Sequence, residues 1–148
     1  MKKIIIFALL IAVVFLINGC TDAVLGPVGG GGTPSSMSKQ NWKMVAPIAI
    51  VDYSYSGNTL DISVMNNSAY TVTIDSFEIR DLDYVSTITD NITLTAGQRK
   101  IVSIAMGSPC LSGTEFSISK DKISIVYSSQ GETNISQEKV FDLVGKCQ

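Results

Sequence analysis

Three cysteines, Cys20, Cys110 and Cys147, are the residues of this chain best suited to covalent chemistry. The chain has no histidine. This absence removes the commonest general base and the commonest transition-metal ligand, and it excludes a Ser-His-Asp triad. No glycine-rich phosphate loop precedes a predicted helix. We therefore expect a protein that is not an enzyme and that uses no cofactor and no metal.

Cys20 stands directly after an apolar leader. Met1-Lys2-Lys3 is basic, residues 4–17 are an unbroken apolar run, and Asn18-Gly19 precedes the cysteine. A basic start, an apolar centre and a small residue at the cut are the layout of a secretory signal peptide. As a helix, the run would span roughly 21 Å, which is short of the roughly 30 Å hydrocarbon core. We therefore expect residues 1–19 to be a signal peptide.

The end of this leader and the cysteine that follows it, Ile17-Asn18-Gly19-Cys20, resemble the lipobox of bacterial-type lipoproteins. The resemblance implies that the Cys20 thiol carries a diacylglyceryl thioether and that the signal is cut after Gly19. Two acyl chains anchor a protein stably, whereas one alone binds marginally. The expected location is the extracytoplasmic face of the cell membrane. The alternatives are an ordinary signal peptide, which leaves Cys20 an incidental thiol, and a retained anchor helix.

Cys110 and Cys147 remain once Cys20 is set aside. In an oxidising exterior an even pair of cysteines indicates one disulfide. It would close a loop of about 36 residues and contribute roughly 3–4 kcal/mol in the chain-entropy model. The alternatives are two unpaired thiols or a site of another kind, although zinc needs four ligands. Because Cys147 ends the last predicted strand, while Cys110 is expected in a loop, the bond would hold an edge strand that is otherwise prone to fraying.

Three asparagines each begin an N-x-Ser/Thr tripeptide at a predicted turn or strand start. They are possible N-glycosylation sites, because a glycan attached there could project into solvent. Such tripeptides also arise by chance in a chain rich in Asn, Ser and Thr. The three residues are Asn66, Asn91 and Asn134.

Three aspartates, Asp81, Asp83 and Asp90, could gather around a calcium ion in one loop. The alternative, which we favour, is an acidic loop that is simply solvated. On this reading the chain holds no metal.

The charge balance limits the possible partners. The chain has eleven Lys+Arg and thirteen Asp+Glu. Without residues 1–19, which contain Lys2 and Lys3, nine basic residues remain and the net charge is −4. The sequence shows no basic patch of the kind that binds nucleic acid or anionic lipid. We expect a membrane partner through the lipid on Cys20, possible contacts with other surface proteins or glycans, no nucleic acid and no small-molecule substrate.

The segment over 20–41 lacks apolar periodicity and is rich in Gly, Ser and Pro. This composition is typical of a flexible coil, and about 20 residues of coil have an r.m.s. span of roughly 25 Å. We expect a tether that lifts a domain clear of the lipid headgroups. Trp42 lies at the junction, where it would pack on the end of the domain. The alternative role for Trp42 is a platform for a ligand.

From Met44 onward, apolar residues alternate with a period of two and turn signals separate the runs, which indicates β-strands. Pro47 predicts that the first run is an edge strand or contains a bulge. A phase slip at Asp75-Ser76 predicts a bulge or a strand that changes sheets. We expect an all-β domain over 42–148, a single immunoglobulin-like β-sandwich of about seven antiparallel strands.

Several phrases of this region resemble the β-sandwich domain of small secreted and pilin-like surface proteins from archaea. The resemblance covers about residues 44–147 and implies display at the cell surface. Pilin-type signals, however, are cut before the apolar helix, whereas here a lipobox-like cysteine follows the run. The phrases are residues 57–67, residues 72–79, residues 91–98 with the following loop cysteine, and Lys146-Cys147.

Two functions of different classes remain. The first is a membrane-anchored extracytoplasmic lipoprotein whose β-sandwich has a structural, adhesive or protein-binding role. Its contact residues would be exposed aromatics such as Tyr53, Tyr55, Tyr70 and Tyr84. The alternative is a pilin-like or envelope-layer subunit that polymerises at the cell surface. A solute-binding lipoprotein is disfavoured because about 104 residues seldom form two lobes.

Overall fold

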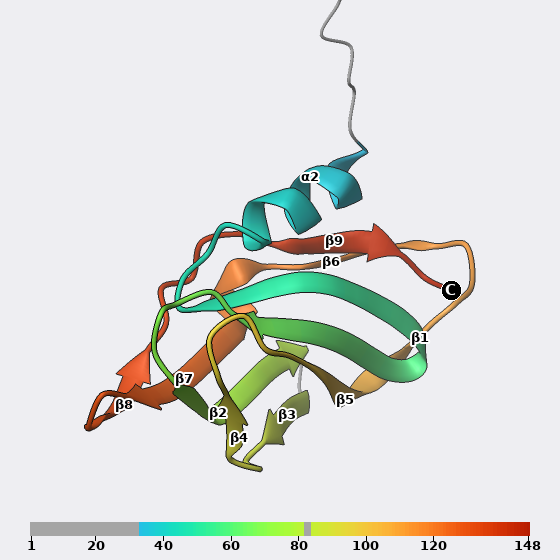
Figure 1. The fold of residues 1–148 in the computed structure, drawn as a ribbon. Coiled ribbons are helices and arrows are strands. Elements are labelled where there is room, and N and C mark those ends of the chain that lie inside the picture. The colour runs from blue at the N-terminus through green and yellow to red at the C-terminus, as the bar shows by residue number, and fades with distance from the viewer. Residues whose placement is uncertain (1–32, 82–83) are drawn as a thin grey trace, which may run out of the picture. The chain divides into compact units, whose positions relative to one another are not determined.

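The computed structural model describes residues 33–81 and 84–148, and this part of the chain is mostly β (Figure 1). The predicted signal peptide, Cys20 and most of the predicted tether lie outside the described residues. Within them the all-β expectation is confirmed, with nine strands in place of about seven. The elements are α2 (Pro34–Trp42), β1 (Ile48–Asn66), β2 (Val72–Asp81), β3 (Tyr84–Ile88), β4 (Ile92–Leu94), β5 (Arg99–Cys110), β6 (Glu115–Ile118), a 3₁₀ turn (Lys120–Lys122), β7 (Ile123–Ser129), β8 (Glu132–Ser136) and β9 (Leu143–Lys146).

β1 bends back on itself near its middle, so that its two arms run side by side (Figure 1). Residues 56–59 are exposed at the bend, where Gly57 has a φ of +53°. Glycine adopts this left-handed conformation without steric cost, which explains the turn predicted from the sequence here. At the end opposite the bend, where β1 begins and finishes, the Asn67 N–H donates a hydrogen bond of 2.6 Å to the Pro47 carbonyl. Pro47 therefore lies just before the strand and does not interrupt it.

β5 pairs antiparallel with the second arm of β1, with Leu60 opposite Ile104. The register shifts between Gly57 and Thr59, and beyond the shift Cys110 pairs with Gly57. The expectation that Cys110 lies in a loop is therefore wrong, because the last residue of β5 is still part of the ladder.

A second sheet has the order β3-β2-β7-β8, and β4 also pairs with β2. In the pairing of β2 with β7 the register shifts between Ile74 and Ser76, which leaves Asp75 as a bulge. The bulge explains the phase slip seen in the sequence. The edge of β2 that faces away from β7 has a different partner on each side of the bulge. Residues 72–74 pair with β4, and residues 77–81 pair with β3. The Ser128 hydroxyl donates to the Asp75 carboxylate at 2.5 Å.

β6 and β9 form an antiparallel pair, and α2 lies over β9 (Figure 1). The Thr33 hydroxyl oxygen accepts a hydrogen bond from the Ser36 N–H at the start of α2, and Pro34 occupies a first-turn position where its missing N–H costs nothing. The expectation of a flexible tether over 20–41 is therefore wrong for residues 34–41, which are helical. Within the described ranges, no helix is long and apolar enough to cross a bilayer.

Trp42 ends α2 and is 1% exposed. Its ring meets the edge of Phe141 with centroids 6.2 Å apart. The prediction that Trp42 packs on the domain, and is not a ligand platform, is confirmed by this burial. The Trp42 ring also explains why α2 forms, since most helical stability in proteins comes from packing one face.

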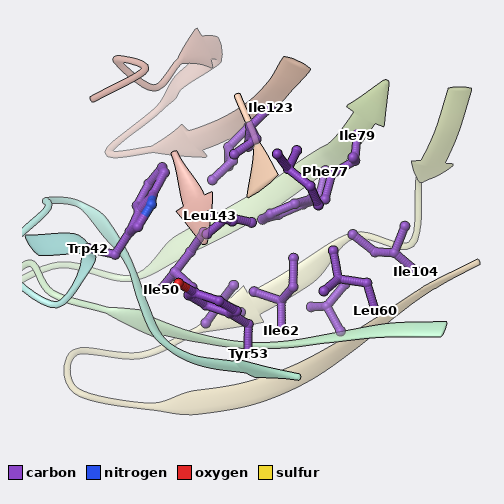
Figure 2. Packing of buried hydrophobic residues seen from close by; sticks show 14 of the residues in the cluster. Trp42, Ile50, Tyr53, Leu60, Ile62, Phe77, Ile79, Ile104, Ile123 and Leu143 are labelled. Atoms are coloured by element: carbon purple, nitrogen blue, oxygen red, sulfur yellow. The ribbon is translucent and has the colours of Figure 1, made fainter. Parts of the chain in front are cut away.

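One hydrophobic core is shared by the β1–β5 sheet, the five-stranded sheet and the β6–β9 pair. Figure 2 shows side chains of β2 and β7 pointing toward side chains of β1 and β5, with Leu143 of β9 and Trp42 at one end. The largest fully buried side chains are those of Trp42, Phe77, Ile48, Ile50, Leu60, Ile62, Ile74, Ile79, Leu94, Ile104, Ile123 and Leu143.

Candidate functional surfaces and the disulfide

Cys110 and Cys147 form a disulfide, as the sequence predicted. Their Cα atoms lie 5.5 Å apart, and both residues are buried. The Thr114 hydroxyl donates to Cys147 Sγ at 3.2 Å, and the Cys147 N–H donates to the Thr114 carbonyl at 2.8 Å. The bond joins the end of β5 to the residue after β9, and so ties the β1–β5 sheet to the β6–β9 pair.

Two further contacts hold β9 next to β1. The Tyr53 hydroxyl donates to the Val144 carbonyl at 2.7 Å and accepts from the Val144 N–H at 3.2 Å. Beyond the disulfide, the Gln148 N–H donates to the Tyr55 carbonyl at 3.0 Å. The Tyr53 side chain thus provides hydrogen-bond partners for the Val144 N–H and carbonyl, which face away from β6. This protects an edge that would otherwise be open to pairing.

The tyrosines predicted as contact residues differ in how far the structure exposes them to solvent. Tyr53 and Tyr55 are only 4% and 6% exposed, so the prediction that they contact a partner is wrong. Both alternate inward on β1, and both rings meet the edge of Phe116. Tyr70 is 59% exposed and stays a candidate contact residue. The side chain of Tyr84 lies outside the described residues.

Asn66 is not available as a glycosylation site in the folded domain. Its side chain is fully buried. The amide nitrogen to which a glycan would be attached donates to the carbonyls of Tyr70 at 2.6 Å and Leu94 at 2.9 Å. The amide oxygen accepts from the N–H and hydroxyl of Ser68. A glycan would remove one of these donors and would have no space, so this site prediction is wrong.

Asn91 and Asn134 are both exposed and stay possible modification sites. Asn91 precedes β4, and Asn134 lies within β8 at a φ of +56°. Asparagine is among the few residues that tolerate this left-handed conformation. The side chains of Asn91 and Asn134 can therefore project into solvent, as a glycan requires.

The possible calcium site cannot be built from the described residues. Asp90 is exposed, whereas the side chain of Asp81 and all of Asp83 lie outside the described part. Elsewhere in the described ranges, no group of three His, Cys, Asp or Glu side chains is close enough together to hold a metal ion.

Lys39 connects α2 to β1 by an ion pair that the sequence did not indicate. Lys39 Nζ lies 2.6 Å from the Asp52 carboxylate and 4.9 Å from the centroid of the Tyr53 ring. The hydrogen bond from Lys39 lowers the pKa of Asp52 below its ordinary value, although partial burial opposes this. The Tyr53 N–H also lowers the Asp52 pKa by donating to the same carboxylate. The pair was missed because no helix was expected around Lys39.

A shallow hollow lies on the outer face of the β1–β5 sheet. The Ser103 hydroxyl next to it donates to the Asp61 carboxylate at 2.6 Å. A catalytic serine is activated by an adjacent base that a third group orients, and Ser103 lacks such an arrangement. The hollow combines the carboxylates of Asp52 and Asp61 with the apolar side chain of Ile101. It is lined by Asp52, Tyr53, Ser54, Asp61, Ser63 and Ile101.

No protein-family model matches this chain, and a search of curated proteins finds no significant match.

Proposed function

We propose that the protein is an extracytoplasmic lipoprotein, held at the membrane by lipid on Cys20 and displaying a β-sandwich with a structural, adhesive or protein-binding role. The disulfide carries this proposal. Because Cys110 and Cys147 are bonded to each other, that bond leaves Cys20 out of the pairing. Cys20 stands directly after the apolar leader, where a lipid would be attached. A disulfide also fits an oxidising compartment outside the cytoplasm.

The sandwich architecture is supported by the way the sheets share one core. Side chains from β1 and β5 meet side chains from β2 and β7. The pairings of all these strands with their neighbours are antiparallel. We propose an immunoglobulin-like outline for this sandwich, because antiparallel strands from separate sheets pack over a shared core in such domains.

The tether is shorter than composition suggested. The compact unit begins at Thr33, thirteen residues after Cys20. Fully extended, this segment reaches at most about 45 Å. A domain of this size has a radius of gyration of about 13 Å. A lipid on Cys20 would thus keep the domain next to the bilayer, which suits contact with other components of the envelope.

A binding role for the domain is supported by exposed residues on strands and loops. Tyr70, Ile101 and Leu111 are each more than half exposed. The hollow on the outer face of the β1–β5 sheet is open to solvent, unlike the enclosed sites that bind small molecules. We therefore favour a macromolecular partner over a small-molecule substrate.

The anchor is tested by replacing Cys20 and following the protein in membrane fractions. The Cys20→Ser variant should move from the membrane to the soluble fraction, because it cannot carry the thioether. The matched control is the double variant Cys110→Ser, Cys147→Ser, which loses two cysteines and should stay with the membrane. Unchanged membrane association of Cys20→Ser would rule out the lipid anchor.

Mass spectrometry of the mature N-terminus separates this proposal from the alternative. A diacylated Cys20 supports the lipoprotein. A retained peptide containing residues 4–17 would instead favour a pilin-like or envelope-layer subunit that polymerises.

A further inference from the structure

We infer that the exposed side of α2 is a second membrane contact, which rests on anionic lipid headgroups when the chain is anchored. The inference rests on the proposed lipid anchor at Cys20. The surface concerned, called here the α2 face, consists of Met37, Gln40, Lys43 and Met44.

The α2 face exposes two methionines where a soluble helix would normally carry only polar side chains. Met37 is 56% exposed and Met44, in the turn that follows the helix, is 70% exposed. They are seven residues apart, and the intervening Lys43 keeps helical φ and ψ, so both lie on one side. The opposite side carries the buried Ser38 and Trp42. Methionine is flexible and polarisable, which suits an irregular boundary such as the headgroup region.

Basic residues surround the C-terminal end of this face. α2 contains no acidic residue, and Lys43 and Arg99 line one hollow together with Asp52. The nearby cations are Lys39, Lys43 and Arg99. Two carboxylates, those of Asp52 and of Asp61 in the adjoining hollow, offset two of these three charges. The surface is therefore locally positive on a chain whose mature form has a net charge of −4. Only the tertiary structure brings Arg99 to this cluster. Anionic headgroups attract such residues.

The chain length selects a bilayer as the occupant. The segment from Cys20 enters the described domain at Thr33, the N-cap of α2 itself. Its reach of at most about 45 Å keeps this helix close to the anchored end. Short linkers produce millimolar effective concentrations. A contact too weak to recruit the free protein would thus be substantially occupied once the lipid is inserted.

The two methionines can report on this contact through their own oxidation by peroxide. The mature chain is attached to vesicles of phosphatidylcholine and phosphatidylglycerol, and oxidation of each methionine is followed by peptide mass spectrometry. Coupling Cys20 to a maleimide lipid imposes the anchor, so the result does not depend on whether cells lipidate Cys20. We expect Met37 and Met44 to be oxidised at least about fivefold more slowly on vesicles than in solution.

Two methionines calibrate the oxidation measurement. Met106, which is 5% exposed, should react slowly in both states. A Val85→Met variant places an exposed methionine on β3, on the other side of the domain from α2 (Figure 1), and should react at the same rate in both states.

The charge is tested by Lys43→Glu, which should abolish the protection of Met37 and Met44, whereas Lys122→Glu on the 3₁₀ turn should not. Equal oxidation of Met37 and Met44 on vesicles and in solution would overturn the inference while leaving the lipid anchor intact. Protection that grows with protein density and not with the anionic lipid fraction would also overturn it, because a second copy would then cover the α2 face.

Discussion

The side-chain amide of Gln137 pairs with the peptide of Ile48 as a neighbouring strand would. The Ile48 N–H donates to Gln137 Oε1 at 3.1 Å, and Gln137 Nε2 donates to the Ile48 carbonyl at 2.7 Å. The Gln137 N–H in turn donates to the Ile125 carbonyl at 2.9 Å. One buried residue therefore links the first residue of β1, through its side chain, to β7, through its backbone, and so connects the β1–β5 sheet to the five-stranded sheet.

Replacing Gln137 with Ala should lower the free energy of unfolding by about 2–4 kcal/mol, because it leaves a buried N–H and a buried carbonyl of Ile48 without partners. Urea denaturation of the mature chain carrying Cys20→Ser measures this. The control Gln40→Ala, at an exposed helix position, should change the free energy by less than about 0.5 kcal/mol. A similar small effect for Gln137→Ala would show that the pairing does not stabilise the domain.

Asn66→Asp should destabilise the domain by about 3 kcal/mol or more. The carboxylate cannot donate to the Tyr70 and Leu94 carbonyls, and it would place a buried charge against two acceptors. The exposed Asn91→Asp is the matched control and should be nearly neutral. Equal unfolding midpoints for the two variants would contradict the buried role of Asn66.

Reduction of the Cys110–Cys147 bond should lower the melting temperature. The sequence separation of 37 corresponds to about 4 kcal/mol in the chain-entropy model. The Cys110→Ser, Cys147→Ser variant should show the same loss and should no longer respond to reductant. If the reductant lowers the melting temperature of that variant equally, the effect does not come from the disulfide.

The contribution of Asp52 to stability should depend on pH. Because Lys39 lowers its pKa in the folded protein, Asp52 stabilises the fold fully above the unfolded-state pKa of about 3.9, and this contribution is lost as pH falls through the lower folded value. The pair is partly exposed to solvent, so the gain is about 0.2–1 kcal/mol. The difference in unfolding free energy between the wild type and Asp52→Asn should be constant from about pH 5 to 8 and shrink below about pH 4. A difference that persists at pH 2 would point to another cause.

Much of the strand structure followed from local pattern. Strict alternation over 60–64 places Leu60, Ile62 and Val64 in the core, and all three are fully buried. The phase slip at Asp75 predicted the bulge, since a bulge inserts one residue and inverts the alternation. The cysteine pairing followed from the number of cysteines and the predicted compartment.

The helix α2 could not be predicted in this way. Pro34–Trp42 has weak intrinsic helicity, and its stability comes from Trp42 and Ser38 packing on distant strands. The tripeptide at Asn66 likewise looked like an exposed glycosylation site. In the folded domain the Tyr70 and Leu94 carbonyls lie next to Asn66, and its amide is therefore a buried hydrogen-bond donor. The local sequence does not show this contact.

By itself, the sequence determined the local features of this protein, namely the period of its strands and the positions of its turns, because each depends on residues close together in the chain. The tertiary structure alone decided which polar groups are buried and which cations gather beside the α2 face. Those outcomes depend on contacts between residues that lie far apart in the sequence, such as Gln137 with Ile48, and no local pattern encodes them.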